Sequence, residues 1–220
     1  MRDVKPPSPS RPPLADSWPA DHPLAVVHQT LGIDITLFPV PADRSGQSTA
    51  VRAAADNLLR AGGVTNPHIG RSEDGAPLWP AGWTGSLSHS RTWGAAVIAP
   101  TSALRSLGVD LEDPSRMKRK LWPYLLCPPE LAELDSLTES AANRRVAAVF
   151  SAKEALYKTL APLGGRVPGF KEVELRWTPD DHFTAHLFPP RLDDAAWPRG
   201  LTGFVCQTHE HLLALAWLPA

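Results

Sequence analysis

The sequence predicts an α+β protein in which a helix packs on each of two small antiparallel sheets. Two observations support this class. Runs of alternating apolar and polar residues, which are typical of strands with one buried face, occur at 33–37 and again from residue 173 onward. Between them lies one long helical pattern that opens near residue 138 or 139 and must end by Pro162, because proline cannot continue a helix.

The composition is that of a folded protein without a general affinity for anionic partners. Apolar residues make up 43% of the 220 positions and eight are tryptophan, which is enough for a substantial core. The net charge of −1 provides no overall attraction to nucleic acid or to a membrane surface, so any phosphate binding must be local. Cys127 and Cys206 lie far apart and form no CxxC motif, so we expect two reduced thiols.

The beginning of the chain and its hydropathy indicate a cytoplasmic protein. The N-terminus lacks the apolar core of a signal peptide, and no apolar run approaches the roughly 20 residues of a membrane span. Residues 1–23 hold seven prolines together with Ser, Arg and Asp, a composition that cannot offset its ordering entropy. We therefore expect a disordered or extended tail at 1–23.

Two halves are expected after this tail, at 24–106 and 107–220. In the first, β-prone runs at 24–40 precede a helix that Ser48 caps and that ends near residue 61, before Gly62. An irregular stretch rich in Gly, Pro and Trp follows at 64–85, and then a buried strand at 93–99. The second half is expected to hold a strand at 107–112, short helices at 117–126 and 129–137, the long helix, and strands at 173–177, 183–188, 201–208 and 212–218.

Three charged residues interrupt the long helix where it should be buried. Between residues 146 and 158 the helix is apolar or small on almost every side, yet Lys153, Glu154 and Lys158 lie within it. A buried charge costs several kcal/mol unless it is paired or bound to a ligand or metal. One interpretation is an ion pair between Glu154 and Lys158, with Lys153 extended toward solvent. The other is a ligand or metal site.

A second acidic motif favours the ligand or metal site. The sequence Gly-Val-Asp-Leu-Glu at 108–112 alternates, so on a strand Asp110 and Glu112 point the same way, about 6.5–7 Å apart at the backbone. Together with Glu154 they would offer three hard oxygen ligands, which suits Mg²⁺ completed by water and phosphate oxygens. The alternative is a half-buried strand with a solvated acidic face.

The histidines do not by themselves indicate a metal centre. His89, flanked by serines, could be a general base, a phosphate ligand or a core residue, and no G-x-S-x-G elbow supports a serine hydrolase. His182 and His186 fall in a strand-like run and His209 and His211 flank a hairpin turn, so we expect surface histidines. Neither G-x-G-x-x-G nor a Walker loop occurs, so side chains must bind any phosphate.

A basic run at 116–120 is either a solvated helix face or a docking surface for an acidic partner protein. Because charge is balanced elsewhere, this local concentration is the feature that suits such docking. Its charged members are Arg116, Lys118, Arg119 and Lys120.

The two acidic motifs, in this order and about forty residues apart, resemble the paired signature of 4′-phosphopantetheinyl transferases. They are Gly-Val-Asp-Leu-Glu at 108–112 and Phe-Ser-Ala-Lys-Glu-Ala-Leu-Tyr-Lys at 150–158. Upstream, the helix with Arg52, Gly-Arg at 70–71, Pro-Leu-Trp-Pro at 77–80, Gly82 and Gly-Ser-Leu-Ser-His at 85–89 resemble the enterobactin-synthase type of that family. The sequence departs from the family at Val51, where Gly is usual, at Ala76, which is basic in the related surfactin type, and at the two serines that flank His89.

The resemblance implies a monomer of two similar α+β halves, with coenzyme A and Mg²⁺ in the cleft between them. It implies transfer of the 4′-phosphopantetheine arm from coenzyme A to a serine of an apo acyl or peptidyl carrier protein, with release of 3′,5′-ADP. Such enzymes serve pathways of secondary metabolism such as peptide synthetases, polyketide synthases and siderophore assembly. The partners implied are therefore coenzyme A and a carrier protein, with no nucleic acid and no membrane.

Site residues carry over by position, as the resemblance implies them. Asp110, Glu112 and Glu154 would hold Mg²⁺, with Glu154, directly or through a metal-bound water, the nearest candidate for the base that activates the carrier serine. Lys153 and Lys158 would contact phosphates, and Lys158 is also a candidate proton donor to the leaving phosphate. The residues that would bind coenzyme A are Arg52, Arg71, Ser88 and His89, with Arg52 and His89 mainly at the 3′-phosphate.

Two other functions fit the same residues. A Mg²⁺-dependent pyrophosphatase or phosphodiesterase would turn over coenzyme A or a nucleotide without a protein acceptor. A non-catalytic carrier-binding module would bind without turnover, although the presence of Asp110, Glu112, Glu154 and Lys158 argues against it.

Overall fold

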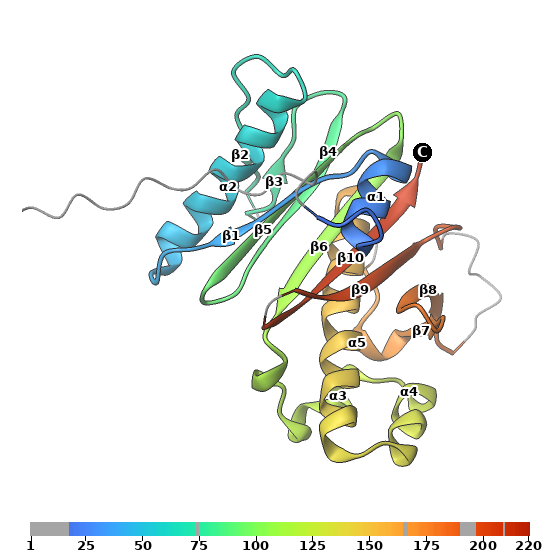
Figure 1. Cartoon of the computed structure of the whole chain (residues 1–220). Coiled ribbons are helices and arrows are strands. Elements are labelled where there is room, and N and C mark those ends of the chain that lie inside the picture. The colour runs from blue at the N-terminus through green and yellow to red at the C-terminus, as the bar shows by residue number, and fades with distance from the viewer. Residues whose placement is uncertain (1–17, 74, 165–166, 190–196, 209) are drawn as a thin grey trace, which may run out of the picture.

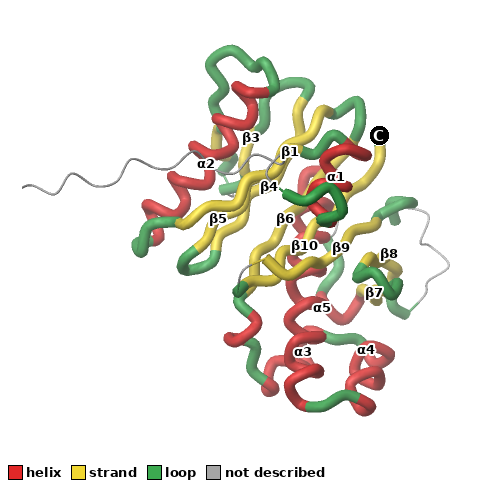
Figure 2. Tube along the Cα trace, viewed as in Figure 1, coloured by secondary structure: helices red, strands yellow, loops and turns green. Residues whose placement is uncertain are grey.

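The computed structural model describes residues 18–73, 75–164, 167–189, 197–208 and 210–220 (Figure 1). Helices and antiparallel sheets are combined in one chain, which confirms the predicted α+β class (Figure 2). A three-stranded sheet has the order β1-β5-β4, a five-stranded sheet has the order β6-β10-β9-β8-β7, and β2 and β3 form a small hairpin. In these described ranges, no helix is both long and apolar enough to cross a membrane.

The first half of the chain places one long helix on the three-stranded sheet. Helix α2 buries Ala55, Leu58 and Leu59 against Ala96 and Ile98 of β5, the middle strand. The elements of this half are α1 (Pro23–Leu31), β1 (Asp34–Pro39), α2 (Arg44–Ala61), β2 (Gly70–Arg71), β3 (Pro77–Leu78), β4 (Trp83–His89) and β5 (Trp93–Pro100).

The second half repeats this arrangement on a larger sheet. Helix α5 packs Val146, Ala152 and Leu156 in one core cluster with Ala214 and Ala216 of β10. Its elements are β6 (Leu104–Glu112), α3 (Trp122–Leu125), α4 (Pro128–Glu133), α5 (Glu139–Leu160), β7 (Val173–Trp177), β8 (His182–Leu187), β9 (Thr202–Thr208) and β10 (His211–Pro219). Short 3₁₀ turns flank α3, α4 and α5.

Four expectations from the sequence are corrected here. The predicted tail is too long, because Trp18 packs against a core cluster and Pro23 already begins α1; residues 1–17 lie outside the described ranges. The start of the 24–40 segment is helical, since proline is accepted in the first helical turn and Gly32 ends α1 with a φ of 64°. Asp43 caps α2 instead of Ser48, its Oδ1 accepting from the backbone N–H of Gly46 at 2.7 Å. Within the supposedly irregular 64–85 stretch, β2 and β3 pair and β4 begins.

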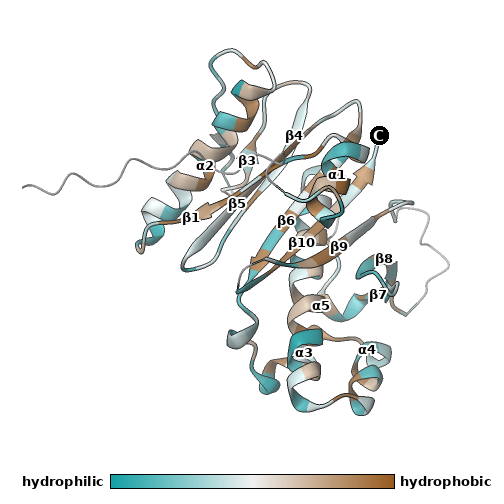
Figure 3. Ribbon diagram, in the orientation of Figure 1, coloured by the Kyte–Doolittle hydropathy of each residue, from teal (hydrophilic) through white to brown (hydrophobic). Residues whose placement is uncertain are grey.

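The two sheets enclose a shared apolar core, so the molecule is layered as helix, sheet, sheet and helix (Figures 1 and 3). Ile35 and Val97 from the first sheet meet Val109 and Leu215 from the second in that core. At one side the edge strands β4 and β6 approach each other, where the backbone N–H of Leu111 donates to the Ser88 hydroxyl at 3.2 Å. The predicted boundary between 106 and 107 falls inside β6.

Alternation along β6 divides its side chains between this shared core and α5. Val109 and Leu111 enter the shared core, so Gly108 and Asp110 face α5. A Cβ atom at Gly108 would overlap the carbonyl oxygen of Ala155 on α5. Glycine is therefore required for α5 to lie this close to β6, and this close approach places the polar residues of α5 beside Asp110.

Candidate active site

Asp110 is the centre of a polar network at the seam between the two halves. Its Oδ1 accepts hydrogen bonds from Lys158 Nζ at 2.9 Å and Ser88 Oγ at 3.1 Å. Its Oδ2 accepts from Ser151 Oγ at 3.0 Å. Ser88 belongs to β4, Asp110 to β6, and the other two residues to α5. The network therefore joins the edge strands of both sheets to the long helix.

Lys158 is a counter-ion for Asp110 that solvent can still reach. Its Nζ also donates to the carbonyl oxygen of Val109 at 2.8 Å and to Ser88 Oγ at 3.2 Å. The Lys158 side chain is 31% exposed, whereas that of Asp110 is 11% exposed. The simple ion pair between Glu154 and Lys158 that the sequence allowed is thus replaced by a pair between Lys158 and Asp110.

Two further carboxyl groups lie within the electrostatic reach of Asp110. Burial, followed by the negative charge of Asp110, raises the pKa of Glu112 to about 7. Burial and then Asp110 also raise the pKa of Glu154, and the positive charge of Lys158 opposes this shift. Glu112 and Glu154 therefore share a region of negative potential with Asp110, which a cation would relieve.

The donor set suits a hard cation, although the side chains do not converge on one point. The negative charge of Asp110 helps to raise the pKa of both Glu112 and Glu154, and carboxylate oxygens are the ligands that Mg²⁺ prefers. Within the described ranges, however, no group of three or more His, Cys, Asp and Glu side chains is arranged to hold a metal ion. Lys158 also fills one side of Asp110. The three-ligand magnesium centre stays a prediction.

A pair of arginines forms a separate positive region on the first half. Arg52 of α2 donates from its guanidinium to the carbonyl oxygens of Gly70, at 2.9 Å, and Gly75, at 3.5 Å, in and after the β2 strand. Burial, and next the positive charge of Arg71, lowers the pKa of Arg52. The charge of Asp56 opposes this shift, and an anion that binds both guanidinium groups would relieve their repulsion.

His89 and Ser88 are neighbours in sequence but face different regions. Leu87 and Trp83 of β4 pack on the α2 side of the sheet, and by alternation His89 points to that same side as Arg52. Ser88 points the other way, into the Asp110 network. The hydroxyl of Ser88 is therefore bound to protein groups, and its predicted contact with coenzyme A stays a prediction.

Lys153 does not lie in this site, which corrects its predicted contact with phosphate. Its side chain is fully buried, and Nζ donates to Glu130 Oε2 at 2.6 Å, to the carbonyl oxygen of Phe170 at 2.7 Å and to that of Leu125 at 3.1 Å. Burial lowers the pKa of Lys153, and the carboxylate of Glu130 opposes that shift. All three ammonium hydrogens have acceptors inside the protein, so Lys153 neither extends to solvent nor awaits a ligand.

Glu130 is the buried partner of Lys153 and was not identified from the sequence. It is 3% exposed and also accepts from the backbone N–H groups of Cys127 and Leu175, each at 3.0 Å. One carboxylate thereby ties α4, β7 and α5 together. A signal was available, because glutamate at the third position of a short helix that starts with two prolines is typical of a capping box.

Comparison with known proteins identifies the family. Residues 106–216 match the model of the 4′-phosphopantetheinyl transferase superfamily, and residues 40–99 match that of the 4′-phosphopantetheinyl transferase N-terminal domain. The chain belongs to the 4′-phosphopantetheinyl transferase superfamily. The resemblance to this family, expected from the two acidic motifs, is thus confirmed.

Individual relatives share about a third of the aligned residues. The 4′-phosphopantetheinyl transferase PptT of Mycobacterium tuberculosis is 32% identical over 69% of this chain and 66% of its own length. Npt of Nocardia iowensis is 37% identical over 51% of this chain and 50% of its own length, and enterobactin synthase component D of Salmonella typhimurium is 33% identical over 66% and 60%. The chain thus spans about half to two thirds of the length of the curated relatives it matches.

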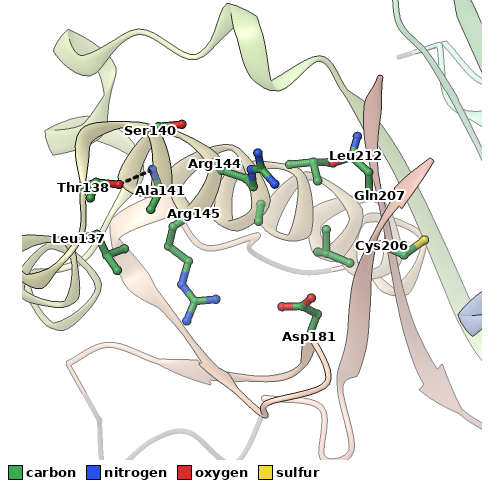
Figure 4. Close-up of a pocket in the computed structure, with 12 residues that line it drawn as sticks. Leu137, Thr138, Ser140, Ala141, Arg144, Arg145, Asp181, Cys206, Gln207 and Leu212 are labelled. Carbon is green, nitrogen blue, oxygen red and sulfur yellow. Dashed lines mark hydrogen bonds between the residues drawn. The ribbon is translucent and has the colours of Figure 1, made fainter. Parts of the chain in front are cut away.

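The transferase motif residues are distinct from a cavity on the same helix. This cavity of about 550 Å³ lies between the N-terminal part of α5 and strands β9 and β10 (Figure 4). Arg145 and Asp181 point into it, but Arg145 already pairs with Glu133 at 3.5 Å and stacks on Trp177 at 4.7 Å. None of the predicted site residues lines this cavity.

The remaining histidines lie outside the Asp110 network. His182 is exposed and His186 is half-buried, and burial lowers the pKa of His186. His211, expected at the surface, is buried at the start of β10, because that strand is central in its sheet. His209 lies outside the described residues.

Proposed function

We propose that this protein transfers the 4′-phosphopantetheine arm of coenzyme A to a serine of an apo acyl or peptidyl carrier protein, with Mg²⁺, and releases 3′,5′-ADP. The observation that carries the proposal is the Asp110 network, in which a buried acid and a partly exposed lysine from α5 meet at the seam of both halves. Family membership supplies the reaction class. The three neighbouring carboxyl groups would bind the cation that accompanies a diphosphate, and the separate arginine pair would bind a phosphate group.

Coenzyme A would bridge the two charged regions. Its 3′-phosphate would lie at Arg52 and Arg71, with His89 on the same side of β4 as Arg52. Its diphosphate would lie at the seam, near Lys158. Ala76, in the loop between β2 and β3, adds no positive charge, so binding of this phosphate would depend on the two arginines.

The reaction would proceed by displacement at the phosphorus that bears the pantetheine arm. The carrier serine oxygen forms the new P–O bond, the bond to the bridging oxygen of 3′,5′-ADP breaks, and the serine proton moves to Glu154. Glu154 lies one helical turn before Lys158, so α5 would present the proton acceptor and the lysine on the same side. Lys158 would neutralise or protonate the departing phosphate. Mg²⁺, held by Asp110, Glu112 and Glu154, would supply electrostatic stabilisation of the diphosphate.

The carrier would approach along the basic segment at 116–120, which begins four residues after Glu112. Arg116, Lys118 and Lys120 are exposed, and Arg119 stacks on Trp122 at 5.4 Å. Beside them the side chain of Tyr124 is 72% exposed. An acidic, partly apolar surface would complement this segment, which suits a small carrier domain.

A carrier modification assay tests the proposal. The protein is incubated with Mg²⁺, coenzyme A and apo carriers from peptide synthetase, polyketide and fatty acid systems, and the carrier mass is measured. We expect a gain of one phosphopantetheine group, lost with EDTA or in Asp110→Asn, and best with carriers of secondary metabolism, including siderophore systems. Hydrolysis of coenzyme A without a carrier would instead identify a phosphodiesterase or pyrophosphatase, and binding without turnover a non-catalytic module.

A further inference from the structure

Ser151 lies on the face of α5 that is turned to Asp110. It precedes Glu154 by three positions and Lys158 by seven, which places the three side chains on one side of the helix. The Ser151 side chain is fully buried, and its Oγ donates to Asp110 Oδ2 at 3.0 Å. Because Ser151 is fully buried where α5 packs on β6, solvent does not reach this hydrogen bond past the helix.

The two side chains that α5 presents to Asp110 differ in length and exposure. Lys158 is long and 31% exposed, so its bond to Oδ1 can be exchanged for a bond to a bound phosphate. Ser151 is short and lies in the middle of a 22-residue helix, so its hydroxyl stays where it is. The hydrogen bond from Ser151 Oγ to Asp110 Oδ2 would therefore persist when Lys158 binds a phosphate instead of Asp110.

A hydroxyl orients a carboxylate without cancelling its charge. Asp110 already has Lys158 as its cation, so a second cation at position 151 would over-compensate its charge, and a methyl group there would leave Oδ2 without its donor. Groups behind a metal-binding carboxylate set its orientation, and their loss typically lowers metal affinity or activity about 10–100-fold.

We propose that Ser151 is a positioning residue, which holds Asp110 Oδ2 and so fixes the orientation of the carboxylate that Asp110 would present to the magnesium. This inference rests on the proposed function. Ser151, the second residue of the 150–158 motif, would thus orient Asp110, a role distinct from those of Glu154 and Lys158.

The test compares Ser151→Ala with Ser106→Ala. Ser106 is a matched control because it is also fully buried at the contact of β6 with α5, but its hydroxyl donates to the carbonyl oxygen of Thr159 at 2.6 Å. Mn²⁺ binding is measured by electron paramagnetic resonance with coenzyme A and without carrier. We expect the Mn²⁺ affinity to fall about 10-fold or more in Ser151→Ala and to change less than about 2-fold in Ser106→Ala.

Carrier modification at varied Mg²⁺ gives a second readout. We expect the Mg²⁺ concentration for half-maximal rate to rise in Ser151→Ala, with partial recovery in Ser151→Thr, which restores the hydroxyl. If Ser151→Ala does not fold, Ser151→Cys replaces it, because a thiol has nearly the same size and is a poor donor. Wild-type metal affinity in a folded Ala or Cys variant overturns the role of Ser151. Failure of the wild-type protein to modify any carrier overturns the proposed function itself.

Discussion

Replacing Lys153 by Met tests whether this motif lysine serves stability or substrate binding. The substitution keeps the length and apolar stem of the side chain but removes the charge that neutralises Glu130. Both side chains are buried, at 0% and 3% exposure, and Nζ lies 2.6 Å from the carboxylate. The variant therefore leaves a buried carboxylate without its cation, and the carbonyl oxygens of Leu125 and Phe170 without this donor.

The expected cost follows from these contacts. Breaking a buried ion pair by removing one partner costs about 3–5 kcal/mol. Glu130 keeps two backbone donors, from Cys127 and Leu175, so we expect the lower part of that range, about 3–4 kcal/mol. For a chain of this size, that corresponds to a fall in Tm of about 6–16 °C.

Urea unfolding followed by circular dichroism measures this cost, and Glu130→Gln/Lys153→Met is the paired variant. We expect the double variant to be more stable than the sum of the single changes, because it contains no unpaired buried charge. The KM for coenzyme A should be unchanged in Lys153→Met, measured well below its Tm. Wild-type stability together with a raised KM would refute this reasoning and restore Lys153 as a phosphate ligand.

Three other predictions concern the acids, the close packing of α5 and the arginine pair. The pKa of Glu112 in the folded protein, about 7, exceeds its ordinary value of 4.5, so between these pH values the folded state binds more protons than the unfolded state. The free energy of unfolding, measured in EDTA, should therefore fall as pH rises from 5 to 8. This fall should be smaller in Glu112→Gln, and equal slopes in urea titrations would contradict it. Gly108→Ala should lower stability by about 3 kcal/mol or more in a thermal melt, while Gly169→Ala, where a Cβ meets only an ordinary contact at 3.6 Å, should be nearly neutral. Arg52→Ala should raise the KM for coenzyme A but not for 3′-dephospho-coenzyme A, and exposed Arg60→Ala should change neither; equal effects on both substrates would remove Arg52 from the 3′-phosphate.

Local rules were enough for most elements and for part of the site. The strand at 173–177 follows from alternation, and the limits of the long helix follow from a helical pattern that opens near residue 138 or 139 and stops before Pro162. The structure has both at the expected places. The common face of Asp110 and Glu112 follows from the period of a strand. Helix α1 was missed because its short apolar run suits a strand equally well.

Tertiary structure alone decided which charges meet. Lys153 and Lys158 lie in the same motif with similar surroundings in sequence, yet one pairs with Glu130 inside the protein and the other with Asp110 at the seam. Those partners are 23 and 48 residues away, so no local pattern specifies them. Lys158 reaches Asp110 because α5 packs closely against β6, which Gly108 permits. Electrostatic pairing acts over a few ångströms in space and does not depend on separation along the chain.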